Sequence, residues 1–269
     1  MQLRFLTLAF CIVLGASTQS FAGLKEGLAA YEAENNVAAL RELKPLADQG
    51  NAVAQRTLGH IYLFDHGNLE NKEESVRWYR KAADQGDGEA QDRLSSAYTW
   101  GIGVAIDKAE ASRWTRKAAN NGFAAAQWSL GNMYRNGDVG APIDRTEAFR
   151  WYQKSANQGY GYGLEAVGDC YSRGEGVFHN RAKATEYYIK AAKAGDVHAT
   201  LKVGELYIEG GDAKTGLKWF AIGAQSGDFS RTDVERRFEE YKNRFSAEEI
   251  LAVTAEADKF WIDNQKKKR

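Results

Sequence analysis

A tetrad ending in glycine recurs along the chain at a nearly constant interval, and this repeat constrains the fold more than any other feature. It reads Ala-Asp-Gln-Gly at 47–50 and 83–86 and is altered in later copies. The glycines that end the copies stand at positions 50, 86, 122, 159, 195 and, in the weakest copy, 227. They are 36, 36, 37, 36 and 32 residues apart. A period of this length is typical of solenoids, in which each short repeat buries its apolar face against the next.

Each repeat has the pattern of two helices joined by a short loop. The twelfth residue after the glycine is always tyrosine: Tyr62, Tyr98, Tyr134, Tyr171 and Tyr207. The residues four and eight places after the glycine are apolar and share one helix face with it. The ninth residue is always small: Gly59, Ser95, Gly131, Gly168 and Gly204. Because glycine within a helix costs about 1 kcal/mol relative to alanine, its recurrence predicts a close approach of two helices.

The second helix of the first four repeats begins at a predicted N-cap. The caps are Asn71, Asp107, Asp144 and Asn180, and three of them are followed by Glu74, Glu110 and Glu147. Asp or Asn followed by glutamate three residues later is typical of a capping box. We therefore assign these carboxylates to helix capping and not to acid–base chemistry. The glycine of each tetrad is expected to end the second helix in a left-handed conformation.

Taken together, these residues resemble Sel-one-like repeats, which are relatives of tetratricopeptide repeats. The similarity rests on the small residues, the Leu-Gly pair and the tyrosine of the first helix, the Gly-x-Gly-Val loops at 101–104 and 174–177, the Asp or Asn cap, and then Ala-x-x-Trp and Lys-Ala-Ala. It extends over residues 51 to about 227. The resemblance implies an all-α fold, a right-handed superhelical solenoid of antiparallel helix pairs.

The N-terminus has the pattern of a cleaved secretory signal peptide. Arg4 precedes an apolar stretch from Phe5 to Leu14, and small and polar residues then lead to Ala22. Cleavage before Gly23 is expected. The apolar stretch is shorter than the roughly 20 residues of a membrane-spanning helix, so we expect no stable membrane insertion after cleavage. The sequence thus predicts a periplasmic or secreted protein.

The domain prediction places capping segments at both ends of the repeats, because a solenoid needs polar-faced ends. It consists of a signal peptide at 1–22, an N-terminal capping helix pair at 23–49, five repeats at 51–227, and C-terminal capping helices with a basic tail at 228–269. The run Ser246-Ala247-Glu248-Glu249 predicts a capping box at the start of the closing helix.

Charge and residue types argue against nucleic-acid binding and against catalysis. The 36 lysines and arginines balance the 36 aspartates and glutamates, so no net field favours a polyanion. The sequence has no Gly-x-Ser-x-Gly elbow and no phosphate-binding loop. The four histidines, His60, His66, His179 and His198, do not have the spacing of a helical metal site. We therefore expect no catalytic residue, no metal and no cofactor.

Cys170 would be the one cysteine left after signal cleavage, so it cannot form an internal disulfide. It occupies a position that is apolar in the other repeats. We expect a buried and inert thiol.

A second face of the first helix differs between repeats, as expected of a binding surface. Positions six, ten and thirteen after each glycine form this face. Its predicted protein-binding residues are Arg56, His60, Asp92, Trp128, Asn132, Arg135, Glu165, Asp169 and Glu205. The resemblance implies that this face lines a concave groove, and its mixed charges suit a polypeptide. Trp128 is the most specific candidate anchor, and the alternative is that it fills space between neighbouring first helices.

The leading functional hypothesis is an exported scaffold that binds another protein or peptide, as a regulator, an assembly factor or an immunity protein that inhibits an effector. Two other classes remain open. One is a cell-envelope enzyme or a binder of a small ligand such as peptidoglycan or a β-lactam. The other is a secreted factor directed at a host.

Overall fold

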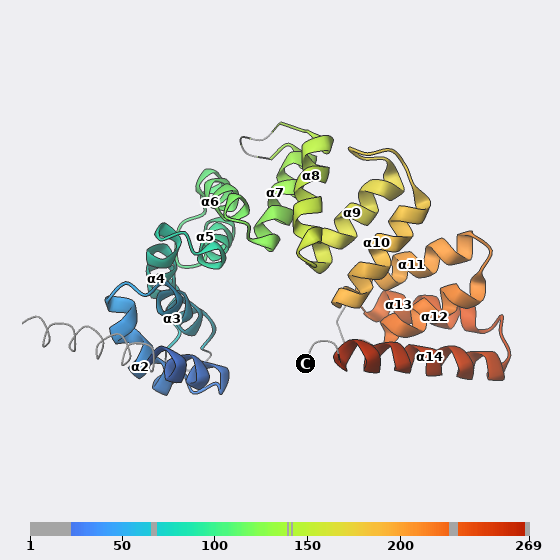
Figure 1. Cartoon of the computed structure of the whole chain (residues 1–269), viewed down its shortest axis with the longest axis horizontal. Coiled ribbons are helices and arrows are strands. Elements are labelled where there is room, and N and C mark those ends of the chain that lie inside the picture. The colour runs from blue at the N-terminus through green and yellow to red at the C-terminus, as the bar shows by residue number, and fades with distance from the viewer. Residues whose placement is uncertain (1–22, 66–68, 139, 141, 226–230, 267–269) are drawn as a thin grey trace, which may run out of the picture. The chain divides into compact units, whose positions relative to one another are not determined.

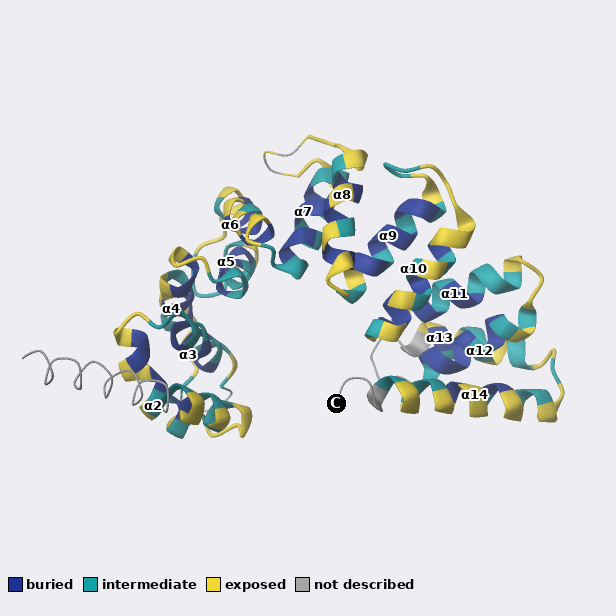
Figure 2. Ribbon diagram, viewed as in Figure 1, coloured by how far each residue is buried: buried dark blue, intermediate teal, exposed yellow. Residues whose placement is uncertain are grey.

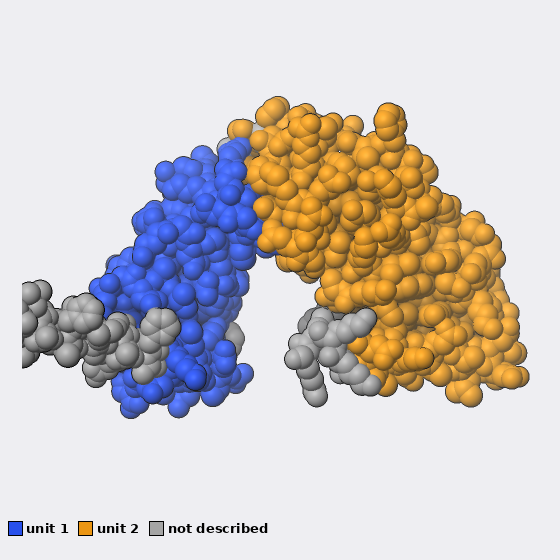
Figure 3. Space-filling view, in the orientation of Figure 1, with its two compact units in different colours: residues 1–126 blue, residues 127–269 orange. Residues whose placement is uncertain are grey.

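The structure is a computed structural model that describes residues 23–65, 69–138, 140, 142–225 and 231–266. Throughout these residues the regular elements are helices, and no strand is present among them (Figure 1). The predicted all-α class is confirmed. The chain divides into two compact units, residues 1–126 and 127–269 (Figure 3), and each is described by itself. Within the described ranges, no helix has both the length and the apolarity to span a membrane.

The first unit consists of an N-terminal helical segment followed by two complete hairpins. Residues 23–32 are helical, and α2 spans Asn36–Asp48. The hairpin helices are α3 (Ala52–Phe64), α4 (Lys72–Asp84), α5 (Gly88–Trp100) and α6 (Lys108–Asn120). Each of α2 to α5 packs against the helix that follows it, so the hairpins of this unit stack in chain order.

The second unit contains the later repeats and the C-terminal helices. Its first helix, α7 (Ala124–Asn136), begins just before the boundary. The helices that follow are α8 (Arg145–Asn157), α9 (Gly161–Arg173), α10 (Arg181–Ala194), α11 (Val197–Glu209), α12 (Ala213–Ala224), α13 (Arg231–Lys242) and α14 (Ala247–Lys266). Consecutive helices from α8 to α13 pack against one another, and α14 packs on α12. The predicted packing of adjacent helix pairs is therefore confirmed.

The predicted helix caps are confirmed, but the glutamates of the second helices do not act as expected. Asn71, Asp107, Asp144 and Asn180 each accept a hydrogen bond from an amide of the first turn. The glutamates at the third helical position instead pair with an arginine three residues later, as Glu74 does with Arg77 at 3.1 Å.

The repeat tyrosine explains this difference. The N-cap amide that a capping-box glutamate would bind already donates to the backbone carbonyl of the tyrosine in the preceding helix. Asn71 N donates to Tyr62 O at 2.8 Å, and Asp144 N donates to Tyr134 O at 2.8 Å. At Ser246 no such acceptor is used, and the predicted capping box is present: Ser246 N donates to Glu249 Oε2 at 3.0 Å.

The tetrad glycines end the second helices as predicted. Gly50, Gly86, Gly122, Gly159 and Gly195 have φ between 77° and 105°. This conformation lets the chain reverse into the next first helix, and the residue after the glycine bonds back to the helix that ends, as Asp87 N does to Ala82 O. The copy that ends at Gly227 lies outside the described residues.

Each hairpin closes where a second-helix ring packs directly on the backbone of the ninth-position glycine. A Cβ added at Gly59 would lie 2.5 Å from ring carbons of Tyr79, and one at Gly168 would lie 2.6 Å from the ring of Tyr188. The second repeat varies the same contact. There Ser95 replaces the glycine, Thr115 replaces the ring, and their hydroxyls are 2.6 Å apart. The predicted close approach is confirmed.

The second-helix tryptophans of the first two repeats are buried, and a lysine covers each of these two rings. Trp78 and Trp114 are 2% and 1% exposed. The lysine three residues later lies over the ring, with Nζ 3.7 Å from the Trp78 centroid and 4.1 Å from the Trp114 centroid. These lysines begin the Lys-Ala-Ala motif, whose alanines are buried. The motif thus combines a cation–π contact with a small-residue core.

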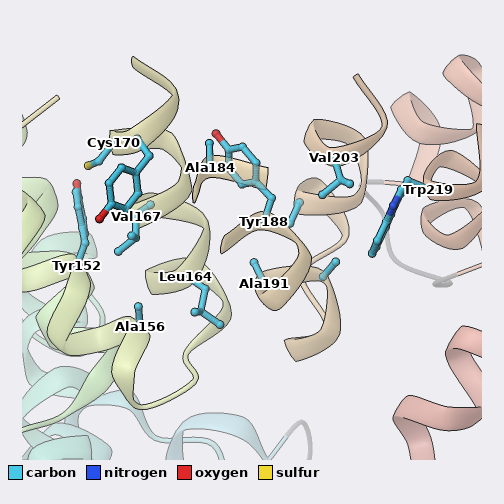
Figure 4. Close-up of a cluster of buried hydrophobic side chains, with 14 of the residues drawn as sticks. Tyr152, Ala156, Leu164, Val167, Cys170, Ala184, Tyr188, Ala191, Val203 and Trp219 are labelled. Carbon is cyan, nitrogen blue, oxygen red and sulfur yellow. The ribbon is translucent and has the colours of Figure 1, made fainter. Parts of the chain in front are cut away.

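Within each unit, buried residues lie along the helices, drawn in dark blue in Figure 2. In the second unit it is built from Tyr152, Val167, Cys170, Tyr188, Val203 and Trp219, among others (Figure 4). Burial raises the pKa of the Cys170 thiol to about 12, so the thiol is protonated at neutral pH. The predicted buried cysteine is confirmed.

Gly59→Ala tests the ring-on-glycine contact. We expect it to lower the free energy of unfolding by about 1–3 kcal/mol, because the new methyl group overlaps the Tyr79 ring. In a Tyr79→Thr background the same substitution should be neutral or stabilising, since alanine is the better helix former by roughly 1 kcal/mol. Chemical denaturation of the four proteins of this cycle measures both values, and an equal penalty in the two backgrounds would contradict the assignment.

Candidate functional site

In the first unit, the predicted binding residues Arg56 and His60 are paired with the next first helix. Arg56 Nη1 lies 3.1 Å from Asp87 Oδ2, and Arg56 Nε lies 3.3 Å from Glu89 Oε2. His60 Nε2 stands 3.3 Å from Glu89 Oε1, within ion-pair range but without an aligned hydrogen bond. These contacts join α3 to α5, so the side chains link one repeat to the next.

Glu89 is the centre of this cluster. The adjacent His60 ring, followed by the charges of Arg56 and Arg93, lowers the pKa of the Glu89 carboxyl to about 2, although burial acts in the opposite direction. Asp92 lies on the same helix, and burial raises the pKa of its carboxyl. The structure shows no ion pair between Asp92 and another described residue.

In the second unit, a lysine neutralises the predicted acidic end of the groove. Lys202 Nζ, on α11, lies 2.7 Å from Glu165 Oε1 and 2.6 Å from Asp169 Oδ1, both on α9. The hydroxyl of Tyr188 also donates to Asp169 at 2.7 Å. Burial disfavours the charged lysine, but Asp169 and Glu165 outweigh it and raise the pKa of Lys202.

Two more predicted residues are held by partners within the second unit. Glu205 Oε1 pairs with Arg237 Nη2 of α13 at 3.2 Å, and Asn132 accepts a hydrogen bond from the Tyr152 hydroxyl at 2.7 Å. Arg135 is half-buried, and none of the described residues forms an ion pair with it. Most of the predicted polar groove is thus already paired inside the chain.

Trp128 belongs to an aromatic surface formed by Trp128, Tyr160 and Tyr162. The Trp128 and Tyr162 rings are 5.5 Å apart, and the Tyr162 and Tyr160 rings are 5.6 Å apart. Trp128 is half-buried and packs at the edge of the core, whereas Tyr162 is 50% exposed. The structure therefore gives Trp128 a packing contact and also places it in an accessible aromatic group.

A pocket of about 580 Å³ adjoins this surface, where α9 and α11 begin. Its lining includes Tyr160, Tyr162, Asp196, Val197 and His198. A volume of this size is within the range of small-molecule and side-chain binding sites.

Positional reasoning from the sequence did not find Glu89, Tyr162 or Lys202. Glu89 and Tyr162 stand three places after a tetrad glycine, a position that shares a helix face with positions six, ten and thirteen. Including position three would have found them. Lys202 stands seven places after its glycine, and only the packing of α11 beside α9 gives it its role.

The described residues contain no group of three histidine, cysteine or acidic side chains arranged to hold a metal ion. Of the histidines, His66 lies outside the described residues.

With the hairpins and their contacts established, comparison with known proteins gives the family. The family model described as the Sel1 repeat matches residues 52–87, 88–123, 124–160, 161–196 and 197–228. The chain belongs to the Sel1 repeat family. The five Sel1 repeats coincide with the five repeats predicted from the glycine spacing. The comparison with curated proteins finds no match.

Two solved structures place this Sel1 repeat protein among its relatives. A Sel1 repeat protein from Oxalobacter formigenes is 31% identical over 77% of this chain and 87% of that chain, with a TM-score of 0.67. The immunity protein PA5088 from Pseudomonas aeruginosa is 18% identical over 91% of this chain and 83% of that chain, with a TM-score of 0.51. The second likeness shows the fold alone.

Glu89→Gln tests the charged cluster that joins α3 and α5. Because the pKa of Glu89 is lowered from 4.5 to about 2 in the folded state, its ionised form stabilises the fold above about pH 4.5. This contribution is lost as the pH falls towards 2. We expect the substitution to lower the free energy of unfolding by about 1–3 kcal/mol at pH 7 and by progressively less below pH 4.5.

Denaturation of the wild type and of Glu89→Gln at several pH values between 7 and 3 measures this difference. Glu186→Gln, which removes an exposed ion pair with Lys190, is the control and should have a much smaller effect. A Glu89→Gln penalty that does not change with pH would contradict the assigned cluster.

Proposed function

We propose that this Sel1 repeat protein is an exported, periplasmic scaffold that binds another protein through the variable face of its first helices. The aromatic surface of Trp128, Tyr160 and Tyr162 is the proposed anchor. The observation that supports the proposal is the contrast between the aromatic and the charged side chains of this face. Tyr162 is 50% exposed and contacts the half-buried Trp128, whereas most charged side chains of the face form ion pairs inside the chain.

Electrostatics supports an aromatic anchor over a charged one. Glu165 and Asp169 are engaged by Lys202, so a partner would have to displace an internal pair to use them. Tyrosine and tryptophan bury a large apolar area at low entropic cost and are enriched among the residues that dominate protein interfaces. In this proposal the ion pairs of Lys202 with Glu165 and Asp169 stabilise the packing of α9 and α11 beside the aromatic surface.

The repeat architecture supports a protein partner. Stacked hairpins create an extended surface over many helices, and such surfaces suit polypeptides better than small substrates. Within this proposal the protein acts as a regulator, an assembly factor or an immunity protein that inhibits an effector. The shared fold of the immunity protein PA5088 is compatible with the last of these roles.

The aromatic surface is tested by Trp128→Ala combined with Tyr162→Ala. We expect at least a tenfold loss of captured partner, because truncation of a central aromatic anchor costs about 2 kcal/mol or more. Affinity purification from the native organism, followed by quantitative mass spectrometry, compares the partner recovered by each variant.

Two controls separate binding from folding. Trp100→Ala removes a tryptophan that is 74% exposed in the first unit, and it should leave capture unchanged. Tyr162→Ala alone leaves Trp128 in its packed position and should still weaken capture. Full capture by the double variant, or an equal loss from Trp100→Ala, would refute the aromatic anchor.

Export is tested at the N-terminus. We expect the mature protein to begin at Gly23 and to be recovered from the periplasmic fraction, because residues 1–22 have the pattern of a signal peptide. N-terminal sequencing and the intact mass of the purified protein measure the cleavage point. A cytoplasmic protein that retains residues 1–22 would contradict the export part of the proposal.

A further inference from the structure

The pocket beside the aromatic surface contains a buried carboxylate with one unpartnered oxygen. Asp196 lines this pocket and is 9% exposed. Its Oδ1 accepts a hydrogen bond from Ala199 N at 3.3 Å and so caps α11. Its Oδ2 accepts no hydrogen bond from any residue that the structure describes. A buried acceptor without a donor costs free energy, so such an atom in a native protein calls for a specific explanation.

An equivalent aspartate earlier in the chain shows what is missing. Asp87 also follows a tetrad glycine directly, and its Oδ1 caps α5 by accepting from Ala90 N at 2.9 Å. Its Oδ2, however, accepts a hydrogen bond from Arg56 Nη1 of the preceding first helix at 3.1 Å. The same cap position therefore has a guanidinium partner in one repeat and none in the other.

The sequence explains why Asp196 lacks this partner. Arg56 stands six places after its tetrad glycine, and the residue six places after Gly159 is Glu165. A carboxylate thus replaces the arginine, and Lys202 is engaged with that carboxylate at 2.7 Å. Burial, followed by the charge of Glu165, raises the pKa of the Asp196 carboxyl, and the Ala199 amide and His198 act in the opposite direction without outweighing them.

The rest of the pocket suits a cation. Of the described residues that line it, none is lysine or arginine. Tyr160 and Tyr162 contribute aromatic rings, and ring faces attract guanidinium groups through cation–π contacts and stacking. The pocket also borders the proposed anchor, because Tyr162 belongs to both.

We propose that this pocket receives an arginine side chain of the partner protein, whose guanidinium donates to Asp196 and stacks on Tyr162. The inference rests on the proposed function, since it names the partner's chemistry at the same face. The incoming arginine takes the role at Asp196 that Arg56 has at Asp87. Arginine fits better than lysine because its planar guanidinium can donate to a carboxylate and stack on a ring at once.

Direct titration with a defined probe tests the pocket without knowledge of the partner. The probe is N-acetyl-arginine methylamide, and its control is the citrulline analogue, which has nearly the same shape but no charge. We expect saturable binding of the arginine probe, followed by NMR shifts of residues around Tyr162 and Asp196. Binding of the citrulline analogue should be at least about tenfold weaker, because a charge-assisted hydrogen bond is lost.

Asp196→Asn is the informative variant, because asparagine caps a helix as well as aspartate does. We expect it to weaken binding of the arginine probe about tenfold or more and to leave the melting temperature equal to or above that of the wild type, since it removes an unpaired buried charge. Asp87→Asn is the matched control at the equivalent cap, and it should not change probe binding.

The outcomes separate this inference from the proposed function. No saturable binding by the wild type, or equal binding by Asp196→Asn or of the citrulline analogue, overturns the arginine pocket. If Asp196→Asn still captures the full amount of a partner that the aromatic double variant loses, the scaffold function stands and this inference fails. If the arginine probe binds as expected and no partner is recovered, the pocket stands and the proposed function fails.

Discussion

The close approach of the two helices at the ninth position is the contact on which the other features of a hairpin depend, and in four of the five repeats a second-helix ring packs there on a first-helix glycine. At Gly59 the Tyr79 ring occupies the space that a Cβ would need, so the two helix backbones can approach closely. Because the two helices are this close, the backbone amide of the residue that caps the second helix can donate a hydrogen bond to the tyrosine carbonyl of the first helix. The close approach also allows the alanines of the Lys-Ala-Ala motif to fill the core without larger side chains.

Because the hairpins are nearly alike, neighbouring first helices present equivalent positions side by side, and the chain uses these positions for ion pairs between repeats. Arg56 pairs with Asp87 and Glu89 of the next repeat. At the position equivalent to Arg56 the later repeat has Glu165, and it pairs with Lys202 of the repeat that follows. Where the pairing is incomplete, as at Asp196, the structure retains an unmet hydrogen-bonding capacity. Binding to a partner is most favourable at such a place, since no internal contact must be broken first.

Much of the architecture was predictable because the residues that each structural constraint requires recur in every repeat or nearly every repeat. The tetrad glycine, the capping residue and the small ninth residue recur at fixed spacing, and each corresponds to a backbone constraint that few residue types satisfy. The capping-box glutamates were assigned wrongly because the assignment considered only the residues of their own helix. Their spacing to the cap is correct, but the Tyr62 carbonyl, which belongs to another helix, already binds the cap amide.

The candidate site was predictable only in part. Helical periodicity selected the face that contains Trp128, because side-chain direction along a helix follows from position alone. The pairing of Lys202 with two carboxylates of α9, the contact of the Tyr162 ring with Trp128 and the unpartnered oxygen of Asp196 could not be predicted from spacing. The sequence by itself determined the hairpins, their caps and their order, since these depend on local backbone geometry repeated five times. Only the tertiary structure decided which charges neutralise each other and which remain available, because that depends on distances between side chains of different helices.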